Sequence, residues 1–180
     1  HLHVHSSYSL LDGSGKIPEM ISRVKELGMD SCALTDHGVM YGVIDFYREA
    51  KKQGIHPILG SEIYLTEDMA EKSLQKGEAR YYHLVLLAEN DTGFHNLMKL
   101  VSLGFTEGYY YKPRVDYAAL EKYHEGIIAL SACLGERFPE HFAITTMKRR
   151  RRRLIATKKF SEKEIFSWKC RITAIRSKSL

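Results

Sequence analysis

Residues 31–65, SCALTDHGVMYGVIDFYREAKKQGIHPILGSEIYL, contain the strand–helix–strand pattern on which the fold assignment depends. Ser31–Thr35 is a short, mostly apolar run, which is typical of a buried strand. An apolar stripe at helical spacing follows, and Gly54 suits the end of that helix. Ile55–Leu65 is again strand-like. Strands and helices that alternate in this way predict parallel strands covered by helices, which is an α/β fold.

The same alternation continues on both sides of this stretch. On the N-terminal side, His1–Val4 is a short strand candidate. Ile17–Leu27 has the apolar spacing of a helix, and Pro18 suits its first turn. On the C-terminal side, the predicted elements are a loop over Thr66–Ala79, a strand over Tyr82–Ala88, a helix capped by Asn90, and a strand over Gly126–Ala132. Four strand–helix units do not close a standard barrel, so the pattern predicts either an open sheet or an incomplete barrel.

The charge divides the chain into two parts near Gly135. The formal net charge is +5 overall, but residues 1–135 carry 13 Lys and Arg against 18 Asp and Glu, and residues 136–180 carry 14 against 4. The two parts therefore have charges of −5 and +10, and all 13 glycines and all aspartates precede residue 136. The sequence predicts an α/β domain over residues 1–135 and a basic, irregular or helical tail over residues 136–180.

The composition also bears on the location of the protein. No run of 18 apolar residues is present, so we expect no membrane-spanning helix. The first residues lack the basic and apolar regions of a signal peptide. Three widely spaced cysteines form no disulfide framework and fit a reducing compartment. We therefore expect a cytoplasmic protein without a membrane partner.

Metal-binding side chains gather where the predicted strands end, and the carboxyl ends of parallel strands form the active face of α/β folds. His3 and His5 alternate along the first strand candidate, so both side chains are expected on one face. Imidazole, carboxylate and thiolate are common ligands of zinc and similar ions. The candidate ligands are His3, His5, Asp12, His37, Glu62, His83 and Cys133. One zinc ion needs about four ligands, so this set predicts a multinuclear site.

Several short motifs resemble a known family. The motifs His3-Val4-His5-Ser6, Leu11-Asp12-Gly13 and Thr35-Asp36-His37-Gly38 are similar to the first two motifs of the polymerase and histidinol phosphatase (PHP) superfamily. The match is closer to one branch, the N-terminal domain of bacterial DNA polymerase III α subunits. The segments that resemble this branch are residues 1–13, 60–64, 81–88, 96–102, 111–114 and 129–134. The resemblance is dense over residues 1–135.

The resemblance implies a distorted (β/α)7 barrel, here incomplete, with a metal cluster at one mouth. It gives metal-ligand roles to the seven candidates, which would act in catalysis through a metal-activated water. The family takes two further ligands from an Asp-x-His motif, and no Asp-x-His follows Cys133 in this chain. The implied cofactor is a cluster of divalent ions, with zinc preferred and manganese or magnesium as alternatives. Lys112 and Arg114 are expected to bind a flanking substrate phosphate.

The resemblance also implies a function. The complete domain would be a metal-dependent phosphoesterase that proofreads DNA as a 3′–5′ exonuclease, within a full-length DNA-directed DNA polymerase. The implied partners are DNA and other replicase subunits such as the sliding clamp. Two alternatives stay open: a stand-alone PHP phosphatase for a small phosphate ester, and an inert structural fragment. Because an incomplete barrel leaves strand edges uncovered, we expect this chain alone to bind metal weakly and to have little nuclease activity.

Residues 136–180 have three alternative explanations. They are a natural basic tail that binds the nucleic-acid backbone, a divergent helix with a charged face, or the product of a shifted reading frame. A shifted frame turns glutamate-rich GAA runs into Arg and Lys codons. It also explains the missing glycines and aspartates, the six consecutive cations of residues 148–153 and the loss of the family pattern after Leu134. We therefore favour the shifted frame.

Overall fold

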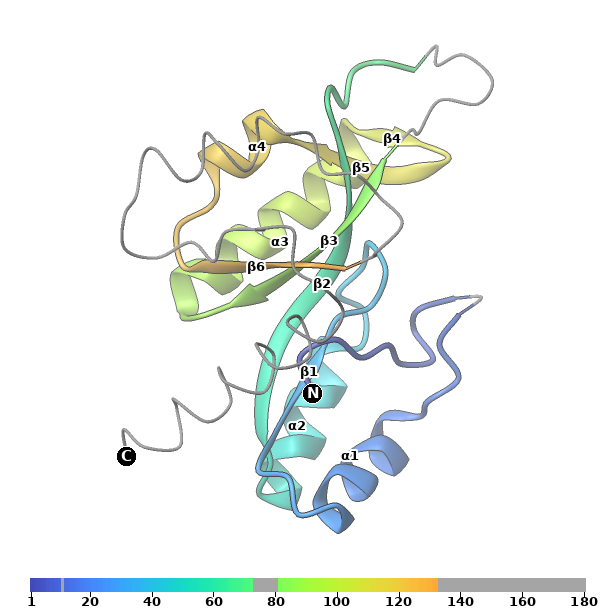
Figure 1. The fold of residues 1–180 in the computed structure, drawn as a ribbon, viewed down its shortest axis with the longest axis vertical. Helices are drawn as coiled ribbons and strands as arrows, with labels where there is room; N and C mark the ends of the chain where they lie inside the picture. Colours follow the sequence, from blue (N-terminus) through green and yellow to red (C-terminus); the bar gives the residue numbers. More distant parts are fainter. Residues whose placement is uncertain (11, 73–80, 133–180) are drawn as a thin grey trace, which may run out of the picture. The chain divides into compact units, whose positions relative to one another are not determined.

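The computed structural model describes residues 1–10, 12–72 and 81–132 and shows a mixed α/β fold with a central sheet (Figure 1). The elements in chain order are α1 (Ile17–Glu26), β1 (Ser31–Leu34), α2 (Val43–Gln53), β2 (His56–Thr66), β3 (Tyr82–Ala88), α3 (Asp91–Thr106), β4 (Tyr109–Tyr110), β5 (Lys112–Asp116), α4 (Tyr117–Lys122) and β6 (Ile127–Ser131). Cys133 and the predicted tail of residues 136–180 lie outside the described residues. The α/β fold class predicted from the sequence is confirmed.

Strand β2 organises the sheet because it is long enough to pair with three neighbours. Its first residues pair in parallel with β1, from Ser31 opposite His56 to Leu34 opposite Leu59. Its second half pairs with β3 in the antiparallel sense and with β5 in parallel. β6 adds to the far side of β3, and β4 forms a hairpin with β5. Within the described residues the strand order has two ends, at β4 and β6.

The expectation of uniformly parallel strands is wrong, because β3 runs antiparallel to both β2 and β6. An antiparallel neighbour needs no crossover helix, and the described part of the β2–β3 link contains none. The first strand candidate is also wrong. The carbonyls of His1 and Val4 accept hydrogen bonds from the N–H groups of Ala33 and Thr35, so this segment runs beside β1 without the ladder of a strand.

The helix boundaries follow the residues that predicted them. Pro18 lies in the first turn of α1. Gly54 ends α2 with a φ of 78°, a left-handed conformation that glycine adopts without steric cost. The Asn90 side chain accepts a hydrogen bond from the Gly93 N–H at 2.9 Å and so caps α3. None of the described helices has the length and apolarity that crossing a membrane requires.

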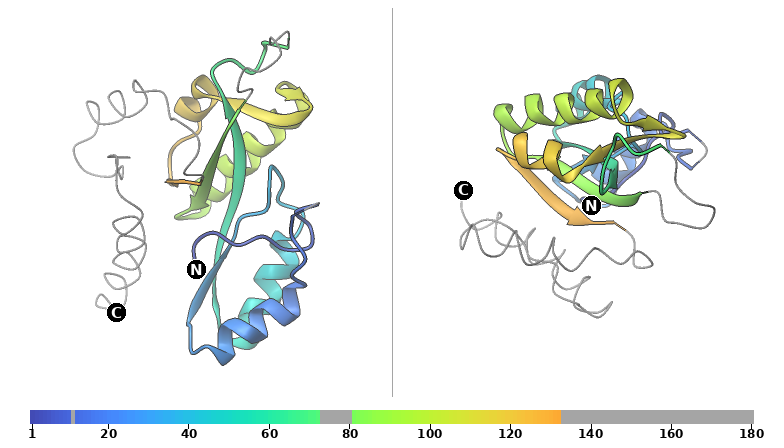
Figure 2. Two further views of the ribbon diagram at one scale, coloured as in Figure 1. Left: turned by 45° about the vertical axis from the view of Figure 1, so that its right-hand side comes forward. Right: turned by 90° about the horizontal axis from the view of Figure 1, so that it is seen from above.

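The helices cover the sheet with their apolar faces. α1 and α2 pack against each other, α1 contacts β1, and α2 contacts β2. α3 lies against β3 and β5 (Figure 2). The apolar core between α1, α2 and the sheet includes the buried side chains of Ile17, Ile21, Leu34, Val43 and Phe46. Each such side chain contributes about 1.5–3 kcal/mol through burial, so these layers hold β2 in a fixed position.

Candidate metal centre

The N-terminal segment is held in place by a buried aspartate, Asp36. The backbone N–H of Ser6 donates to Asp36 Oδ1 at 2.6 Å, and the Ser6 hydroxyl donates to Asp36 Oδ2 at 2.9 Å. Thr35, which precedes Asp36, also holds this segment, because its Oγ1 accepts a hydrogen bond from the Val4 N–H at 3.0 Å. These contacts fix the backbone on both sides of His5 next to the end of β1.

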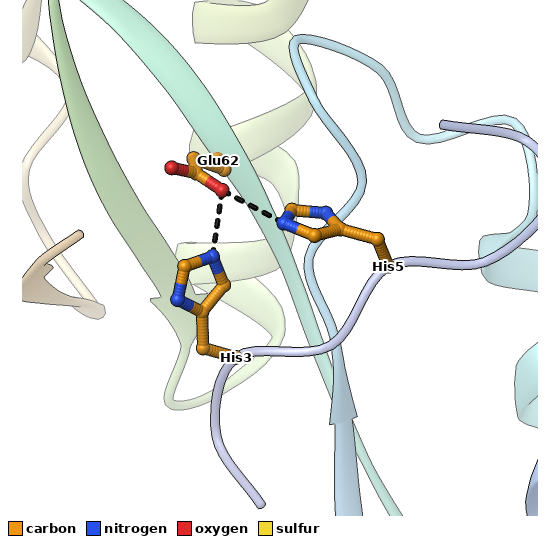
Figure 3. Close-up of side chains that lie close together, drawn as sticks. All are labelled: His3, His5 and Glu62. Carbon is orange, nitrogen blue, oxygen red and sulfur yellow. Dashed lines mark hydrogen bonds and ion pairs between the residues drawn. The ribbon is translucent and has the colours of Figure 1, made fainter. Parts of the chain in front are cut away.

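Glu62 lies at the centre of the site and is only 2% exposed. The Nε2 atoms of His3 and His5 lie 2.6 Å and 3.0 Å from Glu62 Oε2 (Figure 3). His37 Nε2 lies 3.6 Å from the same oxygen. On the other side, His83 Nδ1 lies 3.3 Å from Glu62 Oε1. Four imidazole rings from three separate stretches of chain thus surround one buried carboxylate.

Backbone pairing brings His37 to this carboxylate. His37 forms an isolated parallel bridge with Glu62, in which the Gly38 N–H donates to the Glu62 carbonyl at 2.9 Å. The Glu62 N–H donates in turn to the Asp36 carbonyl at 3.1 Å. His37 Nε2 also lies 2.7 Å from Asp12 Oδ2. The Asp12 side chain is 40% exposed, so it forms the solvent-facing edge of the cluster.

The structure therefore brings together the predicted candidates other than Cys133, which lies outside the described residues. The reason for their convergence differs from the prediction in two places. Glu62 lies inside β2 rather than at its end, and His83 lies near the beginning of β3. Because β3 is antiparallel to β2, the beginning of β3 meets the second half of β2, and His83 pairs with Tyr64.

The carboxylate and its imidazoles change one another's pKa values. Burial alone would raise the pKa of Glu62, but hydrogen bonds from His3, His5 and His83 outweigh it and hold this pKa well below its usual range. The hydrogen bond to Glu62 raises the pKa of His5, against the effect of burial. Burial lowers the pKa of His37 and so favours its neutral form, which is the form that binds metal.

The donor set fits divalent cations. Its residues form three groups whose ligand atoms lie within 4.8 Å of one another. These groups are His3–His5–Glu62, His5–Asp12–His37 and His37–Glu62–His83. They share members, so they form one continuous cluster. Imidazole and carboxylate are a ligand combination that suits zinc and related ions.

Further details support this fit. In the described part of the chain, the Nδ1 atoms of His5 and His37 are buried without a hydrogen-bond partner. The two rings stack with their centroids 4.5 Å apart. A cation bound between the two rings and the Glu62 carboxylate would stabilise this packing, because it attracts the lone pairs of the ring nitrogens and the negative charge of the carboxylate. We conclude that the residues present suit a divalent metal.

An aromatic layer borders the cluster. The Tyr64 ring stacks on His37 with centroids 5.7 Å apart and meets His83 edge-on at 5.3 Å. Tyr81 contacts both Tyr64 and His83. Burial raises the pKa of Tyr64 to about 12, so its hydroxyl stays protonated at neutral pH. Tyr64 is not among the site residues predicted from the sequence, although it lies two residues after Glu62 on the same face of a strand.

Asp36 is a second residue of the site that the sequence did not predict. It precedes His37 directly, but its role depends on Ser6, which lies thirty residues away along the chain.

The two residues predicted to bind a substrate phosphate, Lys112 and Arg114, have different environments. Lys112 is partly exposed, with its Nζ 5.4 Å from the centre of the Tyr64 ring.

Arg114, the other predicted phosphate contact, is fully buried in β5. Its Nη2 donates to the carbonyls of Met69 and Glu71 at 3.2 Å and 2.8 Å, and its Nε donates to the Gly108 carbonyl at 3.2 Å. A guanidinium enclosed in this way is not accessible to a substrate at the surface. We therefore retain only Lys112 as a proposed phosphate contact.

The chain is similar to proteins of one family. The family described as PHP domain matches residues 1–166. The chain is 52% identical to the DNA polymerase III subunit alpha of Borreliella burgdorferi over 141 residues, which cover 77% of this chain and 12% of that protein. It is 50% identical to the same subunit of Helicobacter pylori over 134 residues, which cover 74% of this chain and 11% of that protein. The chain thus spans about an eighth or less of the length of these relatives.

Among solved structures, an amidohydrolase of Chromobacterium violaceum with bound sulfate and no metal is similar to 56% of this chain and 31% of its own. Its sequence identity is 26% and its TM-score is 0.42. The family assignment rests instead on the match over residues 1–166. The matched residues include Glu62 and the four histidines around its carboxylate, which are His3, His5, His37 and His83. The chain belongs to the PHP domain family.

Proposed function

We propose that this chain is a metal-dependent phosphoesterase module that removes nucleotides from the 3′ end of DNA. The observation that carries the proposal is the buried carboxylate of Glu62, surrounded by four imidazoles in a chain of the PHP family. The similarity to DNA polymerase III subunit alpha supports DNA as the substrate and proofreading as the purpose. It also supports DNA polymerisation by the whole protein, other replicase subunits such as the sliding clamp as partners, and the cytoplasm as the location.

The proposed cofactor is a cluster of divalent ions, and the donors favour zinc over manganese and magnesium. The proposed ligands are His3, His5, Asp12, His37, Glu62, His83 and Cys133. Bound divalent ions would supply Lewis acidity, which polarises a phosphoryl oxygen and lowers the pKa of a bound water.

The chain's own residues would prepare the site for this chemistry. Asp36 holds the backbone next to His5, and the bridge to Glu62 holds His37, so the donors are positioned before a substrate arrives. Lys112 would contribute a positive charge near the cluster and bind the phosphate of the DNA strand. Tyr64, which stays protonated, would separate this charge from the imidazoles.

The proposal is tested with the purified chain after its metals have been removed with a chelator. A single-stranded oligonucleotide labelled at its 5′ end is incubated with zinc, manganese or magnesium, and the length of the products is measured. We expect slow, metal-dependent shortening from the 3′ end, because the incomplete barrel predicted from the sequence should bind metal weakly. His83→Ala should slow it at least tenfold. The matched variant His56→Ala, at an exposed position outside the cluster, should not.

Two results would contradict this function. One is the absence of shortening with every metal, which would leave a structural role for the domain. The other is metal-dependent hydrolysis of a small ester such as histidinol phosphate while the oligonucleotide stays intact, which would favour a stand-alone phosphatase.

A further inference from the structure

The β4–β5 hairpin carries an exposed tyrosine at its turn. Tyr110 pairs with Lys112 across the hairpin, so Tyr111 occupies the turn between them. The Tyr111 side chain is 69% exposed, and its φ of 60° lies in the left-handed region. Among the described residues, every other positive φ belongs to a glycine. The turn thus holds a bulky aromatic ring where glycine would be less strained, and such strain is frequently associated with function.

The hairpin is a rigid support for this ring. The buried Arg114 joins its two ends, because its Nε donates to the Gly108 carbonyl just before β4. The Arg114 guanidinium also lies 5.1 Å from the centre of the Tyr110 ring. Tyr110 in turn meets the Tyr111 ring edge-on, with centroids 4.7 Å apart. A ring fixed in this way loses little conformational entropy when it binds a ligand.

The hairpin lies beside the candidate metal centre. Lys112 follows Tyr111 directly, and its Nζ lies 5.4 Å from the centre of the Tyr64 ring. Tyr64 stacks on His37 of the cluster. The packing is tight at this point, since a Cβ atom added to Gly38 would lie only 2.8 Å from the Pro113 side chain. The exposed aromatic ring is therefore next in the chain to a cation, and that cation lies near the tyrosine that stacks on the metal-ligand cluster.

This arrangement suits a single strand of nucleic acid. An exposed aromatic ring binds a base by stacking on its face, and every base offers such a face. A cation next to the ring binds the adjoining phosphate. In a duplex, neighbouring base pairs cover both faces of every base except those of the terminal pair, which expose one face, so an unpaired base is the better partner for the ring.

We propose that Tyr111 is a stacking platform for an unpaired base of the DNA strand whose phosphodiester lies at the metal centre, with Lys112 on the phosphate. This inference rests on the proposed function for its choice of substrate. It adds that the module takes frayed or single-stranded 3′ ends in preference to paired ends.

The test measures binding without metal, so it does not depend on hydrolysis. Fluorescence anisotropy compares the chain's affinity for a labelled oligodeoxynucleotide with its affinity for the same oligonucleotide made abasic at its last three 3′ positions. The backbone charge of the two probes is equal, so the basic residues 136–180 contribute equally to both. Stacking should make the intact probe bind about tenfold more tightly.

The variants separate the ring from the fold. Tyr111→Gly and Tyr111→Asn both tolerate a positive φ and remove the ring, so they should abolish the preference for the intact probe while the circular dichroism stays unchanged. Tyr111→Phe should keep the preference. Tyr47→Ala removes an exposed tyrosine from α2 and is the matched control, with wild-type affinity for both probes.

The inference is overturned if Tyr111→Gly and Tyr111→Asn keep the wild-type preference, or if the wild type binds both probes equally. A base preference that depends on Tyr111, in a protein that hydrolyses no DNA with any metal, would support the platform and contradict the proposed function. If the metal-dependent shortening is the same in the wild type and in Tyr111→Gly, and both probes bind equally, the proposed function is supported and the stacking platform is contradicted.

Discussion

At the scale of single residues, Glu62 decides what the site can be. A carboxylate that is 2% exposed is unfavourable in the protein interior unless partners compensate for its lost hydration. Here the partners are imidazoles, whose charge depends on pH and which also bind metals. The same residue therefore connects the stability of the protein to protons when metal is absent and to divalent ions when metal is present.

Glu62→Gln should lower the affinity for zinc more than tenfold, because the amide keeps the shape of the side chain but removes the negative charge at the centre of the donors. Competition with a chromogenic chelator measures the affinity, and circular dichroism checks the fold. Glu19→Gln, at an exposed position on α1, is the matched control and should bind as the wild type does. Equal zinc affinities for the two variants would remove Glu62 from the ligand set.

The pairing of Glu62 with His5 should stabilise the metal-free protein most at mildly acidic pH. The lowered pKa of Glu62 gives a stabilisation that is present above about pH 4.3 and is lost as the pH falls further. The raised pKa of His5 gives a stabilisation that is present below about pH 6.5 and is lost as the pH rises through the folded-state value. The difference in urea midpoint between the wild type and Glu62→Gln, measured with a chelator present, should therefore be largest between these limits.

Glu62→Gln removes the partner of both effects, so the difference in midpoint between it and the wild type should shrink above and below this range. A difference that does not change between pH 4 and pH 9 would show that the imidazoles do not pair with Glu62 in solution.

At the scale of elements, the length of β2 determines how the site is assembled. Its first residues belong to the layer formed with β1, α1 and α2, and its second half pairs with β3 and β5. Glu62 lies in the second half, three residues after Leu59, which is the last residue of β2 that pairs with β1. The strand therefore brings together ligands from the N-terminal segment and from β3, which pack on different parts of it.

Arg114→Lys should destabilise the protein by roughly 2–4 kcal/mol, because one ammonium cannot replace the fork that serves the carbonyls of Met69, Glu71 and Gly108. Urea unfolding measures the change. The control is Arg23→Lys, since Arg23 is an exposed residue of α1 with a surface ion pair, and its replacement should change stability by less than about 0.5 kcal/mol. Equal stabilities would mean that the buried contacts of Arg114 contribute little.

At the scale of the whole molecule, the cluster joins parts of the chain that are far apart in sequence. The N-terminal segment, the loop after β1, β2 and β3 each provide at least one of its residues. A metal ion that binds only the folded state stabilises it by mass action. Occupancy of the site should therefore be visible as a change in the stability of the described fold.

Zinc should raise the melting temperature. At a free concentration one hundred times the dissociation constant, binding adds about 2.7 kcal/mol, which corresponds to about 5–10 °C for a protein of this size. Differential scanning calorimetry with zinc and then with a chelator measures the shift and its reversal. Glu62→Gln should show a much smaller shift. A shift of equal size in both proteins would indicate that zinc binds elsewhere.

The change in composition at residue 135 concerns the chain as a whole, and we propose that residues 136–180 are translated in a shifted reading frame. Their charge of +10 and their lack of glycine and aspartate support the proposal. The family match extends into this segment, to residue 166. The protein sequence therefore does not decide between the explanations, and the coding DNA provides the test. Translating the coding sequence in the other two frames should restore an Asp-x-His motif. If neither frame contains it, the segment is a natural basic tail or a divergent helix.

Much of the fold followed from local patterns. The helices α1, α2 and α3 were predicted from apolar spacing and from Pro18, Gly54 and Asn90, which act within one or two turns. β4, β5 and α4 were not predicted. These elements are short, and what holds the β5 hairpin, the buried side chain of Arg114, contacts residues more than forty positions earlier in the chain.

The sequence alone determined the α/β class and the residue types of the candidate site, because strand and helix periods and ligand chemistry are local properties. Only the tertiary structure decided that β3 runs antiparallel to β2, that Glu62 is the buried centre of the cluster, and that Arg114 is enclosed in the fold. The direction of a strand and the burial of a charge depend on which distant segments pack together. That packing is set by the free energy of the whole fold, and no short stretch of sequence contains it.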